Sequence, residues 1–144
     1  MTATSMKVLG FKAVALATIL AGGLLFNTFT HAAKKAVNQV KIPATSAAIW
    51  RSIDQETAIL DTSIRSGKLA DLHHHAFAIR DLVAALPSRS GALPADKMAK
   101  MKTYSKFVAT LAERLDAAGD TKDNPAAVSN LAKLKEVLKT IRTD

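Results

Sequence analysis

The sequence predicts an all-α protein, an up-down-up-down antiparallel four-helix bundle that follows an N-terminal signal segment. Apolar residues recur at helical spacing in four stretches after residue 45. Glycine, proline and polar residues separate these stretches by short connections, and no stretch alternates between apolar and polar residues as a half-buried strand does. Because short connections join antiparallel neighbours, the four helices are expected to pack in chain order.

The first 32 residues have the pattern of an export signal. Lys7 and Lys12 precede an apolar run over 13–26, and Thr30-His31-Ala32 fits the small-residue site that signal peptidase cleaves. The run is shorter than the roughly 20 residues that span a bilayer. We therefore expect a periplasmic protein, with residues 1–32 as a signal peptide or, if uncleaved, an N-terminal membrane anchor. Residues 33–44 are then a linker and residues 45–144 the bundle.

The first two helices are delimited by residues that start or stop helices. Thr45-Ser46 provides an N-cap for the first, and Gly67 suits the left-handed position after its end. Pro87 is expected to end the second helix, which begins near Leu69. The predicted core positions of these two helices, with Trp50 expected among them, are Ile49, Ile53, Leu60, Ile64, Leu69, Leu72, Ala76, Phe77, Ile79, Val83 and Leu86.

The third and fourth helices carry similar signals. Pro94 is placed to start the third helix and Gly119 to close it, and Asn124-Pro125 forms an N-cap and first-turn pair for the fourth. Their core positions follow the three-and-four spacing of bundle packing. These positions are Met101, Tyr104, Val108, Leu111 and Leu115 in the third helix, and Val128, Leu131, Leu134, Leu138 and Ile141 in the fourth.

Composition excludes several classes of function. The 144 residues include no cysteine, which rules out disulfides, thiolate zinc sites, iron–sulfur clusters, covalent haem and a cysteine nucleophile. Loss of Lys7 and Lys12 with the signal would lower the formal net charge from +8 to +6. Export makes nucleic acid an unexpected partner for this basic chain. Lys135, Lys139 and Arg142 share one helix face, either as a solvated stripe or as a contact for an envelope protein or anionic lipid.

One set of residues suggests a metal site. Counting along the helical rise from each shared loop places His73 level with Asp61 on the first helix and with Glu113 and Asp116 on the third. Imidazole and carboxylates without thiolate suit Zn(II), Cu(II) or Ni(II). The triplet His73-His74-His75 cannot close on one ion, because its side chains fan over about 200° of the helix. The alternative is that His73 is a structural residue at the core boundary, bonded to a carboxylate.

Arg80 is expected to lie partly buried and to form an interhelical ion pair with Asp54, or a pair with the adjacent Asp81. Glu56 lies near the apolar stripe of the first helix and needs a partner if it is buried. The sequence has no nucleophile elbow, phosphate-binding glycine loop or His-Glu-x-x-His pair, so we expect no enzymatic activity. Haem of the b type remains open as a third class, with His73 as its ligand.

Three segments carry a family resemblance: Ile49-Trp50-x-x-Ile53-Asp54, His73-x-x-Ala76-Phe77-Ala78-Ile79-Arg80-Asp81-Leu82, and Leu115-Asp116-x-x-Gly119-Asp120. Together they resemble small, uncharacterised proteobacterial periplasmic helical-bundle proteins associated with heavy-metal or copper efflux systems. The resemblance implies a periplasmic location and a metal-linked role, with His73 and Asp116 at matching positions. It implies no defined activity.

Two hypotheses follow from the sequence. The first is a periplasmic helical bundle that binds or buffers a divalent transition metal as an accessory to metal efflux. The alternative is a non-catalytic structural or interaction module of the cell envelope, without a metal site, in which a surface such as the Lys135, Lys139 and Arg142 stripe docks a partner.

Overall fold

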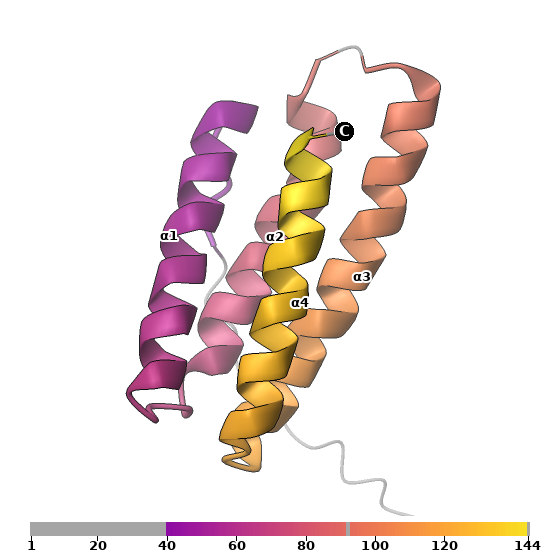
Figure 1. Ribbon diagram of the computed structural model, residues 1–144. Coiled ribbons are helices and arrows are strands. Elements are labelled where there is room, and N and C mark those ends of the chain that lie inside the picture. The colour runs from indigo at the N-terminus through magenta and orange to yellow at the C-terminus, as the bar shows by residue number, and fades with distance from the viewer. Residues whose placement is uncertain (1–39, 92, 144) are drawn as a thin grey trace, which may run out of the picture. The chain divides into compact units, whose positions relative to one another are not determined.

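The computed structural model describes residues 40–91 and 93–143, and these form the predicted four-helix bundle. The helices are α1 (Ser46–Arg65), α2 (Leu72–Arg89), α3 (Ala95–Asp120) and α4 (Asn124–Thr143), each packed against the next (Figure 1). The N-termini of α1 and α3 and the C-termini of α2 and α4 lie at one end of the bundle. The predicted signal segment lies outside the described residues. Within those residues, no helix combines the length and apolar character that crossing a bilayer requires.

Most of the predicted core is confirmed. The expected aliphatic positions of α1 and α2 are buried, as are Val108, Leu111 and Leu115 of α3. Val128 is a correction: its side chain is 52% exposed. Val128 lines a cavity between α1 and α4 together with Asp61 and Ile64 of α1, so α1 does not cover the Val128 side chain. Val40 and Ile42 of the predicted linker are partly buried and pack against the core.

The beginning and end of α1 confirm the expected capping residues. The Thr45 hydroxyl accepts a hydrogen bond from the Ala48 N–H at 3.2 Å. Gly67 takes a φ of 68°, its N–H donates to the Ile64 carbonyl at 3.1 Å, and the Lys68 N–H donates to the Ser63 carbonyl at 2.8 Å. This pair of bonds is a Schellman motif, which glycine closes without steric cost.

Two predicted helix ends are wrong. Pro87 does not end α2, which continues through it to Arg89. Pro87 falls in the last turn, where the Ser90 hydroxyl donates to the Leu86 carbonyl at 2.7 Å and satisfies one terminal acceptor. Gly119 does not close α3 either. The left-handed residue after α3 is Lys122, with a φ of 55°.

Gly119 instead permits a close approach between backbones. A Cβ atom at this position would lie 2.7 Å from the Leu69 carbonyl oxygen and 3.5 Å from Leu72 Cβ. The last turn of α3 therefore packs directly on the connection between α1 and α2. This contact holds together the end of the bundle at which α1 joins α2 and α3 joins α4.

Candidate functional site

The structure does not assemble the predicted metal ligands. His73 is 8% exposed, its Nδ1–H donates to the carbonyl of Ala70 in the connection before α2 at 3.2 Å, and its ring lies 3.7 Å from that of His74 between centroids. Glu113 is exposed. Among the described residues, no three His, Asp or Glu side chains are grouped so that they could hold one metal ion.

Asp61 is turned towards α4. Its carboxylate accepts a hydrogen bond from Lys135 Nζ at 2.8 Å and contacts Arg65 Nη2 at 2.6 Å. The hydrogen bond from Lys135, with the positive charges of Lys135 and Arg65, holds the pKa of Asp61 below its usual value of 3.8 against the opposing effect of desolvation. The number of residues between Asp61 and the end of α1 predicts its position along the bundle axis, but it does not predict the direction in which its side chain points.

The side chains of Asp116 and His74 each have one buried polar atom. Asp116 Oδ1 and His74 Nδ1 are buried without a hydrogen-bond partner in the described part of the chain. Buried polar atoms are normally bonded to protein, water or an ion. Asp116 belongs to the predicted metal ligands and His74 does not, and the hydrogen bonding of these two atoms is not explained by the described protein groups.

The predicted pair between Arg80 and Asp54 is replaced by two others. Arg80 Nε donates to Asp81 at 2.8 Å, which is the adjacent alternative, and its guanidinium lies 4.5 Å over the Phe77 ring. Asp54 accepts from Arg142 Nη2 at 2.6 Å. Arg80 therefore forms its ion pair within α2, and the carboxylate of Asp54 forms an ion pair with Arg142 of α4.

A bond between His75 and Glu56 was not predicted as a pair. His75 Nδ1 lies 2.6 Å from Glu56 Oε2, and both side chains are about three-quarters buried. The bond links α2 to α1. The signal in the sequence was the position of Glu56 beside the apolar stripe, but its partner depends on how the two helices are rotated.

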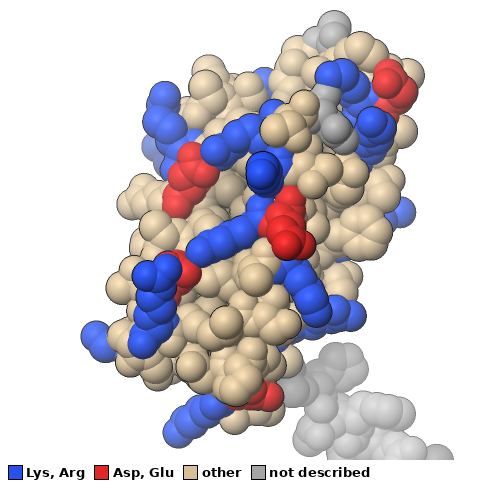
Figure 2. All heavy atoms as spheres, viewed as in Figure 1, with Lys and Arg blue, Asp and Glu red and all other residues tan. Residues whose placement is uncertain are grey.

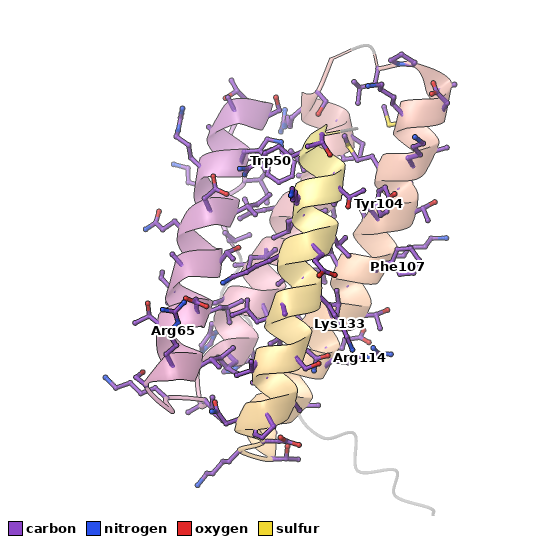
Figure 3. The ribbon with its side chains drawn as sticks, viewed as in Figure 1. Trp50, Arg65, Tyr104, Phe107, Arg114 and Lys133 are labelled. Carbon is purple, nitrogen blue, oxygen red and sulfur yellow. The ribbon has the colours of Figure 1, made fainter. Side chains whose placement is uncertain are left out.

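Ion pairs span the seam between α1 and α4. Asp54 and Asp61 are seven residues apart on α1, and Arg142 and Lys135 are seven apart on the antiparallel α4, so the pairs form two rungs. The Arg142 guanidinium also lies 4.4 Å over the ring of Trp50, which Figure 3 shows beside α4. Two of the three predicted stripe residues, Lys135 and Arg142, are thus engaged within the bundle.

Basic residues gather at one end of the bundle. When each helix is cut at its midpoint, the half containing the α3 N-terminus and the α4 C-terminus holds nine Lys or Arg and four Asp or Glu, a net +5. The other half holds four and five, a net −1. On the face shown in Figure 2, blue side chains outnumber red ones and occur along the length of the bundle. We call the first half the basic pole; its cations are Arg51, Arg89, Lys97, Lys100, Lys102, Lys106, Lys135, Lys139 and Arg142.

The basic pole contains a cavity of about 180 Å³. The apolar part of its lining comes from Met101 and Tyr104 of α3 and Ile141 of α4, and Lys97, Lys100 and Arg142 provide cationic groups. No acidic side chain occurs among the described residues that line it. The cavity therefore combines an apolar interior with a positive rim.

Two large apolar residues are exposed within the described ranges. Phe107 is the last residue of the basic half of α3, with its ring 6.4 Å from that of the cavity residue Tyr104, and Val128 lies in the opposite half of α4. Helices that lie on membranes expose a broad apolar face beside their cations. In the described part of the basic pole, Phe107 is the one large apolar residue that is exposed.

The fold and this site together define a small all-helical bundle with one strongly basic end. Comparisons with protein-family models, with curated proteins and with solved structures gave no match.

Proposed function

We propose that this chain is a non-catalytic interaction module of the cell envelope that docks an acidic protein partner through the basic pole. The observation that carries the proposal is the charge difference between the two halves of the bundle, +5 against −1. Like charges gathered at one end raise the local potential and speed encounter with a surface of opposite sign. The periplasmic location comes from the export pattern of residues 1–32.

A binding assay with matched charge variants tests this proposal. The pole variant carries Lys102→Gln, Lys106→Gln and Lys139→Gln, all at exposed positions. The control variant carries Lys68→Gln, Arg114→Gln and Lys133→Gln, which are exposed in or beside the other half and give the same net charge. Figure 3 shows Arg114 and Lys133 on the neighbouring helices α3 and α4, below Tyr104.

The probe is fluorescently labelled poly-L-glutamate, measured by anisotropy at low salt and at physiological salt. We expect the unmodified protein to bind, and binding to weaken as salt screens the pole. The pole variant should bind roughly tenfold more weakly, and the control variant should bind as the unmodified protein does. Equal losses in the two variants would overturn the proposal, because net charge alone would then explain binding.

Vesicles containing anionic lipid separate an acidic protein from a membrane as the partner. The proposal expects weak vesicle binding, because the pole exposes no broad apolar face. Tight vesicle binding that the pole variant loses, together with no poly-L-glutamate binding, would assign the pole to a membrane and refute an acidic protein partner.

A divalent transition metal, Zn(II), Cu(II) or Ni(II), is a second candidate ligand. One observation favours it: Asp116 Oδ1 and His74 Nδ1 are buried without a partner. Thermal melts with each ion in turn test it, because a specific ion raises the melting temperature with its occupancy. Asp116→Asn should abolish that rise. An unchanged melting temperature with all three ions would remove this candidate and leave the interaction module unaffected.

A further inference from the structure

The seam between α1 and α4 is the least extensive contact between neighbouring helices in the bundle. The other neighbouring pairs, α1 with α2, α2 with α3 and α3 with α4, each pack much more extensively than α1 packs on α4. Parts of a protein that share few packing contacts open at a lower free energy than the fold as a whole. The seam is therefore the line along which this bundle is expected to open first.

Two cavities follow the seam. One, of about 200 Å³, has Leu138 in its lining, and the other, of about 280 Å³, is lined by Ile64, Val128 and Leu131. Ile64 and Leu131 are only 2% and 4% exposed, whereas Val128 is 52% exposed. Apolar side chains that line a void make fewer dispersion contacts than close-packed ones do. Helices α1 and α4 are thus incompletely packed against each other.

The two rungs hold this seam together. Arg142 binds Asp54 at 2.6 Å, and Lys135 binds Asp61 at 2.8 Å. Lys135 lines both cavities, so its side chain lies between them. The four side chains of the rungs are between 24% and 60% exposed. Ion pairs at such positions contribute little free energy and are screened by salt. The strength of the seam should therefore fall as ionic strength rises.

The contacts of α1 with the rest of the bundle depend less on salt. Glu56 of α1 and His75 of α2 are bonded at 2.6 Å, and both side chains are about three-quarters buried. Buried pairs are screened much less than exposed ones. The last turn of α3 holds the connection from α1 to α2, because Gly119 brings that turn directly against the Leu69 carbonyl. An opening at the seam can therefore leave α1 attached to α2.

We propose that the seam between α1 and α4 is a salt-dependent gate in the side of the bundle. In the open form both rungs are broken and α1 stays packed on α2. The two cavities then join into one groove, with Ile64, Leu131 and Leu138 exposed in its walls. The gate does not rest on the proposed function, because it opens without a partner.

Thiol labelling tests the gate, because the chain has no cysteine of its own. Leu131→Cys places a single thiol in the seam. The matched control is Leu111→Cys on α3, since Leu111 is 6% exposed and lies outside the described lining of both seam cavities. The reagent is an aromatic disulfide that releases a coloured thiolate when it reacts with an exposed thiol. We expect Leu131→Cys to be labelled about tenfold faster than Leu111→Cys in the absence of urea.

The urea dependence of labelling identifies which opening exposes each thiol. Its slope scales with the surface exposed, so labelling through the gate should depend weakly on urea and labelling through global unfolding should depend steeply on it. We expect the weak dependence for Leu131→Cys and the steep one for Leu111→Cys. Equal slopes would overturn the gate, because unfolding of the whole bundle would then expose both thiols.

Salt gives a second readout of the same opening. Raising the salt concentration to about 1 M should speed the labelling of Leu131→Cys severalfold by screening the rungs. Leu138→Cys, in the lining of the other seam cavity, should respond in the same way and reports the gate if Leu131→Cys does not fold. A labelling rate that does not rise with salt at either position would overturn the salt dependence of the gate.

Removing one rung tests the mechanism with a matched control. In the Leu131→Cys protein, Lys135→Gln should speed labelling severalfold and make it less sensitive to salt, because the bond to Asp61 is lost. The control is Lys133→Gln, the same change at an exposed position two residues away on α4, and it should leave the rate unchanged. Circular dichroism confirms that each variant is folded. Equal effects of the two substitutions would show that the rung does not hold the gate.

Discussion

Replacing Gly119 with alanine tests the packing that closes the bundle opposite the basic pole. At an ordinary helical position this change stabilises a protein by about 1 kcal/mol, because alanine is the better helix former. Here the new Cβ would lie 2.7 Å from the Leu69 carbonyl oxygen, a backbone atom that has to move. Overpacking of this kind typically costs about 1–3 kcal/mol. We therefore expect a net loss of about 1–2 kcal/mol.

Urea denaturation followed by circular dichroism measures this loss, with Ala117→Gly as the control. Ala117 is exposed in the same turn of α3, so that change reports helix propensity alone and should cost about 1 kcal/mol. A Gly119→Ala protein that gains what Ala117→Gly loses would show that the glycine is merely a poor helix former. The close approach of α3 to Leu69 would then be refuted.

Three further predictions concern the ends and seams of the helices. Lys122→Gly should raise stability by roughly 0.5–1 kcal/mol, because Lys122 takes a left-handed φ of 55°; a lower urea midpoint would contradict this. The stability that Asp61 gains from Lys135 should be present above pH 3.8 and lost as the pH falls through its lowered pKa, so the urea midpoints of the parent and Asp61→Asn should converge in acid; a constant difference would refute it. A double-mutant cycle of Glu56→Gln and His75→Ala should give a coupling of about 1 kcal/mol or more, and additive effects would argue against their bond.

The sequence predicts the helices of this protein far better than their ends. Apolar spacing predicts α1 to α4 and most of the buried positions, because a helix in a small bundle has one direction in which to bury its apolar side. It misses Leu82 and four buried alanines, Ala78, Ala112, Ala118 and Ala127. Val128 escapes this rule, since burial there also requires α1 to close over α4. Gly119 and Lys122 show the limit at helix ends. A glycine suits either a left-handed turn or a close approach between backbones, and here Gly119 permits a close approach while Lys122 takes the left-handed position.

The contacts of the predicted metal ligands follow less well from the sequence than the helices do, because they depend on how the helices pack against one another. The level of a residue along the bundle follows from counting, and Asp61 and His73 were placed in that way. Which helix a side chain meets depends on rotations of about 100° per residue and on the crossing of the helices, so Asp61 meets Lys135 and not His73. Four lysines of α3, Lys97, Lys100, Lys102 and Lys106, are spread around the circumference of that helix. Their accumulation with the cations of α4 at one end of the bundle follows only from the antiparallel packing of α3 and α4.

The accumulation of cations at the basic pole is expected to lower the stability of the fold. Cations that share the pole repel one another, and repulsion between neighbouring like charges destabilises a fold by a few tenths of a kcal/mol per pair. The pole variant, Lys102→Gln, Lys106→Gln and Lys139→Gln, should therefore melt a few degrees higher than the unmodified protein at low salt, an advantage that disappears near 1 M salt. The control variant removes cations from a half with a net charge of −1 and should not gain stability. If the pole variant is less stable than the control variant, its three lysines stabilise the fold, and a role in binding a partner is refuted. Residues that function in binding are expected to be ones whose replacement leaves the stability of the fold unchanged or raises it.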